Sequence, residues 1–121
     1  MAKVKVLIAE DDITMVSLLK TLLKMEGFEV LALQPDADVP LAVRNEKPDI
    51  VLLDVHLFGQ SGLDILSDIR EATETATTRV VMSSGSDVRE ECARRGANGF
   101  LMKPYMPDDL ITTLRQVLQA A

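Results

Sequence analysis

The sequence predicts an α/β fold built on a parallel β-sheet. Short runs rich in Val, Ile and Leu recur along its 121 residues, and each is followed by a segment whose apolar residues have helical spacing. This alternation is typical of repeated strand–helix units, in which helices cover a parallel sheet. Some of the runs are apolar throughout, as strands buried on both faces of such a sheet are.

Five strands are expected along the chain. They are predicted at residues 4–9, 29–33, 50–54, 79–83 and 99–102. The first, third and fourth are the most apolar, so we expect them in the middle of the sheet. The second and the fifth are more polar and are expected at its periphery.

Five helices are expected to follow these strands, at residues 14–26, 39–46, 62–71, 87–95 and 107–119. The apolar residues of the first helix recur at the spacing of one face: Met15, Leu18, Leu19, Leu22 and Leu23. N-caps are predicted at Asp38, Ser61 and Ser86 for the second, third and fourth helices. Pro107 fits the first position of the last helix, because its missing N–H is unpaired there in any case.

Composition and charge exclude several classes of protein. The chain carries 13 basic and 19 acidic residues, a net charge of −6, which disfavours direct binding to nucleic acid. Its apolar runs are far shorter than the ~20 residues of a membrane-spanning helix. Its single cysteine, Cys92, cannot form an intrachain disulfide, which favours the reducing cytoplasm. We expect one domain over residues 1–121, with no output domain in this chain.

Polar side chains follow the predicted strands. Acidic residues follow the first and third strands, hydroxyls the fourth and an ammonium the fifth: Glu10, Asp11 and Asp12; Asp54; Ser83 and Ser84; Lys103. Ligands of open parallel sheets bind beyond the carboxyl ends of the strands. Carboxylates crowded there either bind protons with raised pKa values or hold a cation, and oxygen ligands favour magnesium, manganese or calcium.

Four sequence blocks resemble the response-regulator receiver domain, the phosphate-accepting part of two-component signalling. The blocks are VLIAEDD, IVLLD, VVMSSG and FLMKP, and the resemblance extends over residues 3–119. It implies a three-layer, doubly wound, flavodoxin-like receiver fold with five parallel strands in the order 2-1-3-4-5. It also implies a phosphorelay switch that catalyses only its own phosphorylation and dephosphorylation.

The resemblance assigns a phosphoacceptor and a metal site. Asp54 is expected to accept a phosphoryl group from a phosphohistidine of a histidine kinase or a histidine phosphotransfer protein. Glu10 and Asp11 match the acidic pair that holds Mg²⁺, for which Mn²⁺ is a substitute. Asp54 and the backbone carbonyl of His56 match the remaining protein ligands. Asp12 is either part of this acidic group or simply the N-cap of the first helix.

The resemblance also assigns residues that respond to phosphorylation. Ser84 and Lys103 are expected to bind phosphoryl oxygens, and we prefer Ser84 to Ser83 because a glycine follows it. Phe100 matches the aromatic switch position, although large aromatic residues mainly bury area. The bond between Lys103 and Pro104 is expected to be cis.

The implied partners are proteins. They are the phosphoryl donor and either a downstream effector or a covalently linked output domain, with the chain a monomer or a weak homodimer. Two features depart from the family: Phe58 replaces the usual proline, and fewer residues than usual separate Ser84 from Lys103. The missing residues fall around the fourth helix, which normally belongs to the output surface. The sequence therefore does not identify the surface through which this chain passes on its signal.

Three alternative functions share parts of this pattern. An aspartyl-phosphate phosphatase would need a second aspartate where His56 stands. A flavodoxin-like cofactor carrier would need a glycine- and hydroxyl-rich loop where Glu10 and Asp11 stand. An interaction module that works without phosphorylation remains open as the third alternative.

Overall fold

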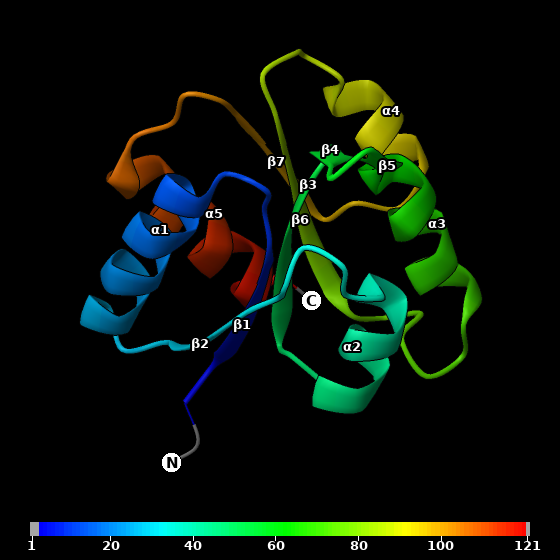
Figure 1. Ribbon diagram of the computed structural model, residues 1–121, viewed down its shortest axis with the longest axis horizontal. Helices are drawn as coiled ribbons and strands as arrows, with labels where there is room; N and C mark the ends of the chain where they lie inside the picture. Colours follow the sequence, from blue (N-terminus) through cyan, green and yellow to red (C-terminus); the bar gives the residue numbers. More distant parts are fainter. Residues whose placement is uncertain (1–2, 121) are drawn as a thin grey trace.

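The computed structural model describes residues 3–120 and places five parallel strands between two layers of helices (Figure 1). The strands of this sheet are β1 (Lys5–Ala9), β2 (Glu29–Ala32), β3 (Ile50–Asp54), β6 (Arg79–Ser84) and β7 (Gly99–Met102). Their spatial order is β2-β1-β3-β6-β7. Counted within this sheet, that is the predicted order 2-1-3-4-5, so the doubly wound fold is confirmed.

The helices divide between the two faces of the sheet. Helices α1 (Ile13–Met25) and α5 (Pro107–Gln119) cover one face, and α2 (Val39–Glu46), α3 (Gly62–Glu71) and α4 (Arg89–Arg94) cover the other (Figure 1). Each expected helix is present, and α2, α3 and α5 have the predicted bounds. Within residues 3–120, every helix is too short or too polar to span a lipid bilayer.

Each face of the sheet has its own apolar core, because successive strand residues point to opposite sides. In β1, Val6 and Ile8 pack with α1 and α5, whereas Leu7 and Ala9 face α2 and α3. All five residues of β3 are buried, as predicted for an inner strand. Because β1 and β3 are anchored in these cores, the polar residues at their carboxyl ends have fixed positions.

Side-chain caps begin three of the helices. Asp12 Oδ1 accepts the Met15 N–H at 3.1 Å, so the N-cap alternative describes what this side chain does here. Asp38 accepts the Leu41 N–H at 3.1 Å at the start of α2. The Ser61 hydroxyl accepts the Asp64 N–H at 3.3 Å in the first turn of α3. The predicted caps at Asp38 and Ser61 are therefore confirmed.

The cap predicted at Ser86 is wrong. Helix α4 has six residues and starts at Arg89, with Val88 as an N-cap that makes no side-chain hydrogen bond. The Ser86 N–H donates to Ser84 Oγ at 3.1 Å and its carbonyl accepts the Val88 N–H at 3.0 Å. Ser86 is therefore held in a turn that precedes the helix and cannot serve as its cap.

The apolar face predicted for the first helix is one residue too wide. Leu19 and Leu23 are buried in α1, and Met15 packs against the same core, but Leu18 is 53% exposed. Helical geometry turns Leu18 about 100° away from the buried Leu19, to a side of the helix that faces solvent.

A small antiparallel hairpin, absent from the sequence prediction, follows β3. Its strands β4 (His56–Leu57) and β5 (Gln60–Ser61) pair His56 with Ser61 and Leu57 with Gln60. The two residues between them, Phe58 and Gly59, both have positive φ, 47° and 78°. That is the backbone of a two-residue hairpin turn of type I′.

Candidate functional site

The carboxyl ends of β1 and β3 bring three carboxylates together. The two strands are neighbours, with Ala9 paired to Leu53, so Glu10 and Asp54 project from the same edge. Glu10 is 5% exposed and Asp54 is 6% exposed, whereas Asp11 is open to solvent. One carboxylate oxygen of each lies within 4.8 Å of the others.

Lys103 joins this cluster from the carboxyl end of the edge strand β7, two strands away from β3. Its Nζ lies 2.6 Å from Glu10 Oε1 and 2.9 Å from Asp54 Oδ2, so the ammonium bridges both buried carboxylates. The backbone fixes where this side chain starts, because the Lys103 N–H donates to the Ser84 carbonyl at 2.8 Å. Its peptide bond to Pro104 is cis.

The cluster changes the proton affinities of its members. Burial, followed by the neighbouring Asp54, raises the pKa of Glu10 to about 7, although Lys103 acts in the opposite direction. Burial by itself lowers the pKa of Lys103, but its hydrogen bonds to Glu10 and Asp54 outweigh this and raise it. The edge therefore holds a fixed cation beside a carboxyl that titrates near neutrality.

Backbone N–H groups orient the carboxylates further. The Asp11 N–H donates to Glu10 Oε2 at 2.9 Å, and the His56 N–H donates to Asp54 Oδ1 at 3.3 Å. The Phe58 N–H donates to Asp11 Oδ2 at 3.4 Å. His56 itself lies in β4 with an exposed side chain. The hairpin therefore supplies two N–H donors to the carboxylates of this site, those of His56 and Phe58. In the sequence, the Phe58–Gly59 pair was the signal for this hairpin.

The two serines at the end of β6 are both buried. Asp54 pairs in register with Ser83, whose carbonyl accepts the Val55 N–H at 2.9 Å. Ser84, 1% exposed, accepts the Ser86 N–H on its Oγ at 3.1 Å. Within residues 3–120 this hydroxyl donates no hydrogen bond, so its hydrogen can be donated to a ligand.

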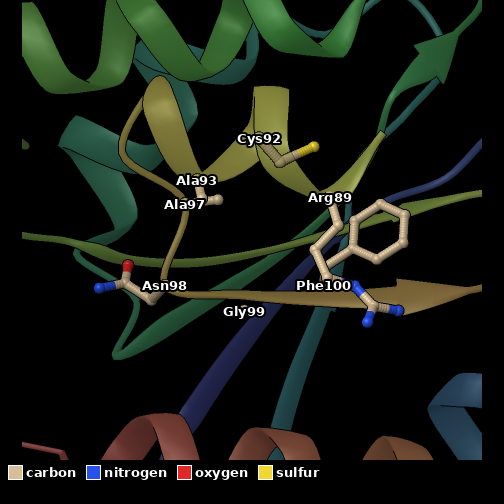
Figure 2. Close-up of a pocket in the computed structure, with 7 residues that line it drawn as sticks. All are labelled: Arg89, Cys92, Ala93, Ala97, Asn98, Gly99 and Phe100. Carbon is tan, nitrogen blue, oxygen red and sulfur yellow. The ribbon is translucent and has the colours of Figure 1, made fainter. Parts of the chain in front are cut away.

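Phe100 lies away from the acidic cluster, in a groove between β7 and α4. It is half-buried, and the Arg89 guanidinium carbon lies 5.4 Å from its ring centroid (Figure 2). The groove also contains Cys92, whose buried thiol has a raised pKa because burial disfavours the thiolate. Phe100 therefore packs beside the short helix α4, with the Arg89 guanidinium near its ring.

The donor set fits a hard divalent cation. Glu10, Asp11 and Asp54 offer carboxylate oxygens only, the ligand type that Mg²⁺ prefers. Among residues 3–120, no buried side-chain nitrogen or oxygen lacks a hydrogen-bond partner. A cation among these oxygens would therefore compete with the Lys103 ammonium for Glu10 and Asp54.

Comparison with known proteins shows which protein family this chain resembles. A family model described as the response regulator receiver domain matches residues 6–115. The transcriptional regulatory protein CpxR of Klebsiella pneumoniae is 33% identical over 115 residues, which make up 95% of this chain and 49% of that protein. The chain therefore spans about half the length of the curated relatives it matches.

Solved structures share the fold. The chemotaxis response regulator CheY4 of Vibrio cholerae is 25% identical, with a TM-score of 0.82 that covers 96% of this chain and 99% of that one. The receiver domain of sensor histidine kinase PA1611 from Pseudomonas aeruginosa was solved with a magnesium ion coordinated in its active site cleft. It is 19% identical, with a TM-score of 0.87 over 98% of this chain and 100% of that one, a likeness of fold.

Proposed function

The chain belongs to the response regulator receiver domain family of two-component signalling, and on this premise we propose that Asp54 is its phosphoacceptor. The observation that carries the proposal is the bridging ammonium of Lys103 on the nearly buried Asp54 carboxylate. Asp54 ends the central strand β3, at the switch point where ligands of this fold class bind. Its two oxygens are held by Lys103 and by the His56 N–H.

We assign Glu10, Asp11 and Asp54 as the carboxylates that hold Mg²⁺, with Mn²⁺ as a substitute and the His56 carbonyl as a further ligand. The mutual proximity of the three carboxylates supports this set. When bound, a divalent cation neutralises negative charge on the transferred phosphoryl oxygens. The set has no Cys or His side chain, so it favours hard cations over zinc.

The transfer step follows from these positions. One Asp54 carboxylate oxygen attacks the phosphorus of a phosphohistidine in line, and the phosphorus–nitrogen bond breaks as its electron pair returns to the imidazole. The donor is a histidine kinase or a histidine phosphotransfer protein. Lys103 is already within hydrogen-bond distance of the attacking group, so its ammonium meets the new negative charge without crossing the site.

The acyl phosphate then changes local contacts. The phosphoryl group carries a charge of about −1.5 to −2 and strong acceptor oxygens, and it replaces the single negative charge of the Asp54 carboxylate. Lys103 transfers hydrogen bonds to them from Glu10, and the free Ser84 hydroxyl hydrogen supplies another. To make this hydrogen bond, Ser84 moves inward toward Asp54. Because Ser84 precedes the turn that leads into α4, this movement also shifts the groove where Arg89 and Phe100 lie.

This movement is the output that we propose. The chain acts as a signalling domain and modifies no separate substrate. The partner that responds to this movement is a protein effector or an output domain linked to the chain. A linked output domain fits the length of the matched relatives, which are about twice as long. We place the domain in the cytoplasm, where the donor kinase works, and assign it no direct contact with nucleic acid because of its net charge of −6.

The test is the intact mass of the protein after incubation with acetyl phosphate, with Mg²⁺ or with EDTA. We expect the wild type to gain the mass of one phosphoryl group with Mg²⁺, and Asp54→Asn to gain none. Asp12→Asn is the matched control, because asparagine keeps the cap of α1 and should leave the gain unchanged. No gain in the wild type, or an equal gain in Asp54→Asn, contradicts the proposal.

A further inference from the structure

The hairpin turn after the phosphoacceptor carries a backbone conformation that its sequence does not favour. Phe58 has φ 47°, in the left-handed region that bulky residues rarely adopt, and Gly59 follows with φ 78°. Such strained residues persist only where the surrounding structure determines them, and they concentrate at functional sites. The Phe58 side chain is 38% exposed, so burial of the ring does not account for the conformation.

Both ends of the hairpin are fixed. Leu57, 2% exposed, anchors the first strand in the core between the sheet and the helices α2 and α3. At the other end the Gly62 N–H donates to the Val55 carbonyl at 2.6 Å. Gly62 packs so closely that an added Cβ would overlap the carbonyl oxygen of Asp54. The turn between these anchors therefore has little freedom to relax its strain.

The fixed turn aims one N–H at the cation site. The Phe58 N–H donates to Asp11 Oδ2 at 3.4 Å, across 47 positions of sequence. Within residues 3–120 this is the one hydrogen bond that the Asp11 carboxylate accepts, and Asp11 is otherwise exposed. Glu10 and Asp54, by contrast, are buried, and each is held both by Lys103 and by a second hydrogen bond from a backbone N–H.

We propose that Phe58 is a positioning residue that acts through its backbone N–H, holding Asp11 toward Glu10 and Asp54 so that the three can bind a divalent cation. This inference rests on the cation site of the proposed function. Proline, the residue usual in the family, could not take this role, because it has no N–H and its φ is fixed near −65°. The hairpin therefore gives this chain its own means of orienting a metal ligand.

Two substitutions at one position separate the backbone from the ring. Phe58→Gly keeps the N–H and suits a positive φ, whereas Phe58→Pro removes the N–H and forbids that φ. Each variant of the full 121-residue chain is titrated with Mg²⁺ by isothermal calorimetry, and its fold is checked by circular dichroism. We expect Phe58→Gly to bind Mg²⁺ within about twofold of the wild type. Phe58→Pro should bind it about 10-fold more weakly, the lower end of the effects seen when a contact to a metal ligand is lost.

A second measurement needs neither the proline variant nor a metal. In the metal-free protein, Asp11→Ala should shift the amide proton resonance of Phe58 upfield and speed its exchange with solvent. Asp12→Asn, one residue away, should leave that amide unchanged. An unmoved Phe58 amide in Asp11→Ala overturns the inference, because the hydrogen bond would then be absent.

The outcomes separate this inference from the function beneath it. Equal Mg²⁺ affinity in folded Phe58→Pro and Phe58→Gly overturns the role of Phe58 and leaves the phosphoacceptor proposal in place. A wild type that binds no Mg²⁺ overturns both the cation site and the inference. Weaker binding in Phe58→Pro alone, with the Phe58 amide moved by Asp11→Ala, supports the positioning role.

Discussion

Replacing Lys103 with Met removes the cation between two buried carboxylates and keeps an unbranched side chain of similar length. The Lys103 side chain is 23% exposed, and those of Glu10 and Asp54 are 4% and 7% exposed. Lys5 supplies a matched control, because it is also 23% exposed and lies 2.8 Å from Glu46 Oε1. Glu46, however, is 45% exposed, so water solvates it when Lys5 is lost.

Lys103→Met should lower the free energy of unfolding several times more than Lys5→Met does. Removing one partner of a buried ion pair costs about 3–5 kcal/mol, and the partial exposure of Lys103 places it near the lower end, at about 3 kcal/mol. An exposed pair is worth about 0–1 kcal/mol, so Lys5→Met should lower the free energy of unfolding by no more than that.

The cost of Lys103→Met should rise with pH. The pKa of Glu10 in the folded protein is raised from 4.5 to about 7, so the folded state binds more protons than the unfolded state across this interval. Stability therefore falls as pH rises through it. Lys103 acts to lower this pKa, so its loss raises the pKa further and extends the fall to higher pH. The deficit should thus be larger near about pH 8 than near about pH 5.5.

Urea unfolding followed by circular dichroism, in EDTA and at both pH values, measures these differences. The reasoning predicts a deficit for Lys103→Met that exceeds that of Lys5→Met at the higher pH and narrows at the lower. Equal deficits for the two variants at the higher pH, or a larger Lys103→Met deficit at the lower, would refute it.

Further predictions concern packing, a structural arginine and the cation site. Gly62→Ala should lower the free energy of unfolding by about 3 kcal/mol, because its Cβ would overlap the backbone at the end of β3. Gly85→Ala, whose Cβ would meet nothing within 4 Å, should change it by less than about 0.5 kcal/mol in the same urea unfolding assay. Arg70 donates to three carbonyls and one side-chain oxygen, so Arg70→Lys should cost about 2 kcal/mol and speed amide exchange at residues 96–98; unchanged exchange would contradict this role. Mg²⁺ affinity measured by calorimetry should increase as pH rises through about 7, because Glu10 must lose its proton to act as a ligand, and a flat profile would contradict that assignment.

The strands and helices could be predicted because their signals are local. The apolar run in β3 and the spacing of Leu110 and Leu114 in α5 each identify an element without knowledge of its neighbours. The strand order is not local, and its prediction came from the resemblance between four sequence blocks and a known family. Ser86 shows the limit of local signals, since a hydrogen bond to Ser84 holds it outside the helix that it was expected to cap.

The site was predictable only in part, for the same reason. Acidic residues after neighbouring strands had to meet, and the structure brings Glu10 and Asp54 together. The double contact of Lys103 depends on groups 93 and 49 positions away, and no local pattern encodes it. The hairpin had a short signal in the Phe58–Gly59 pair, but phenylalanine is not a residue that favours the first position of such a turn.

Locating the phosphoryl group in the sequence tests the central claim most directly. After incubation with acetyl phosphate and Mg²⁺, borohydride reduces an acyl phosphate to the corresponding alcohol, and peptide mass spectrometry identifies the reduced side chain. The account predicts reduction at Asp54, the last residue of β3, and none in Asp54→Asn. Reduction at Glu10, Asp11 or Asp12 instead of Asp54 would contradict it.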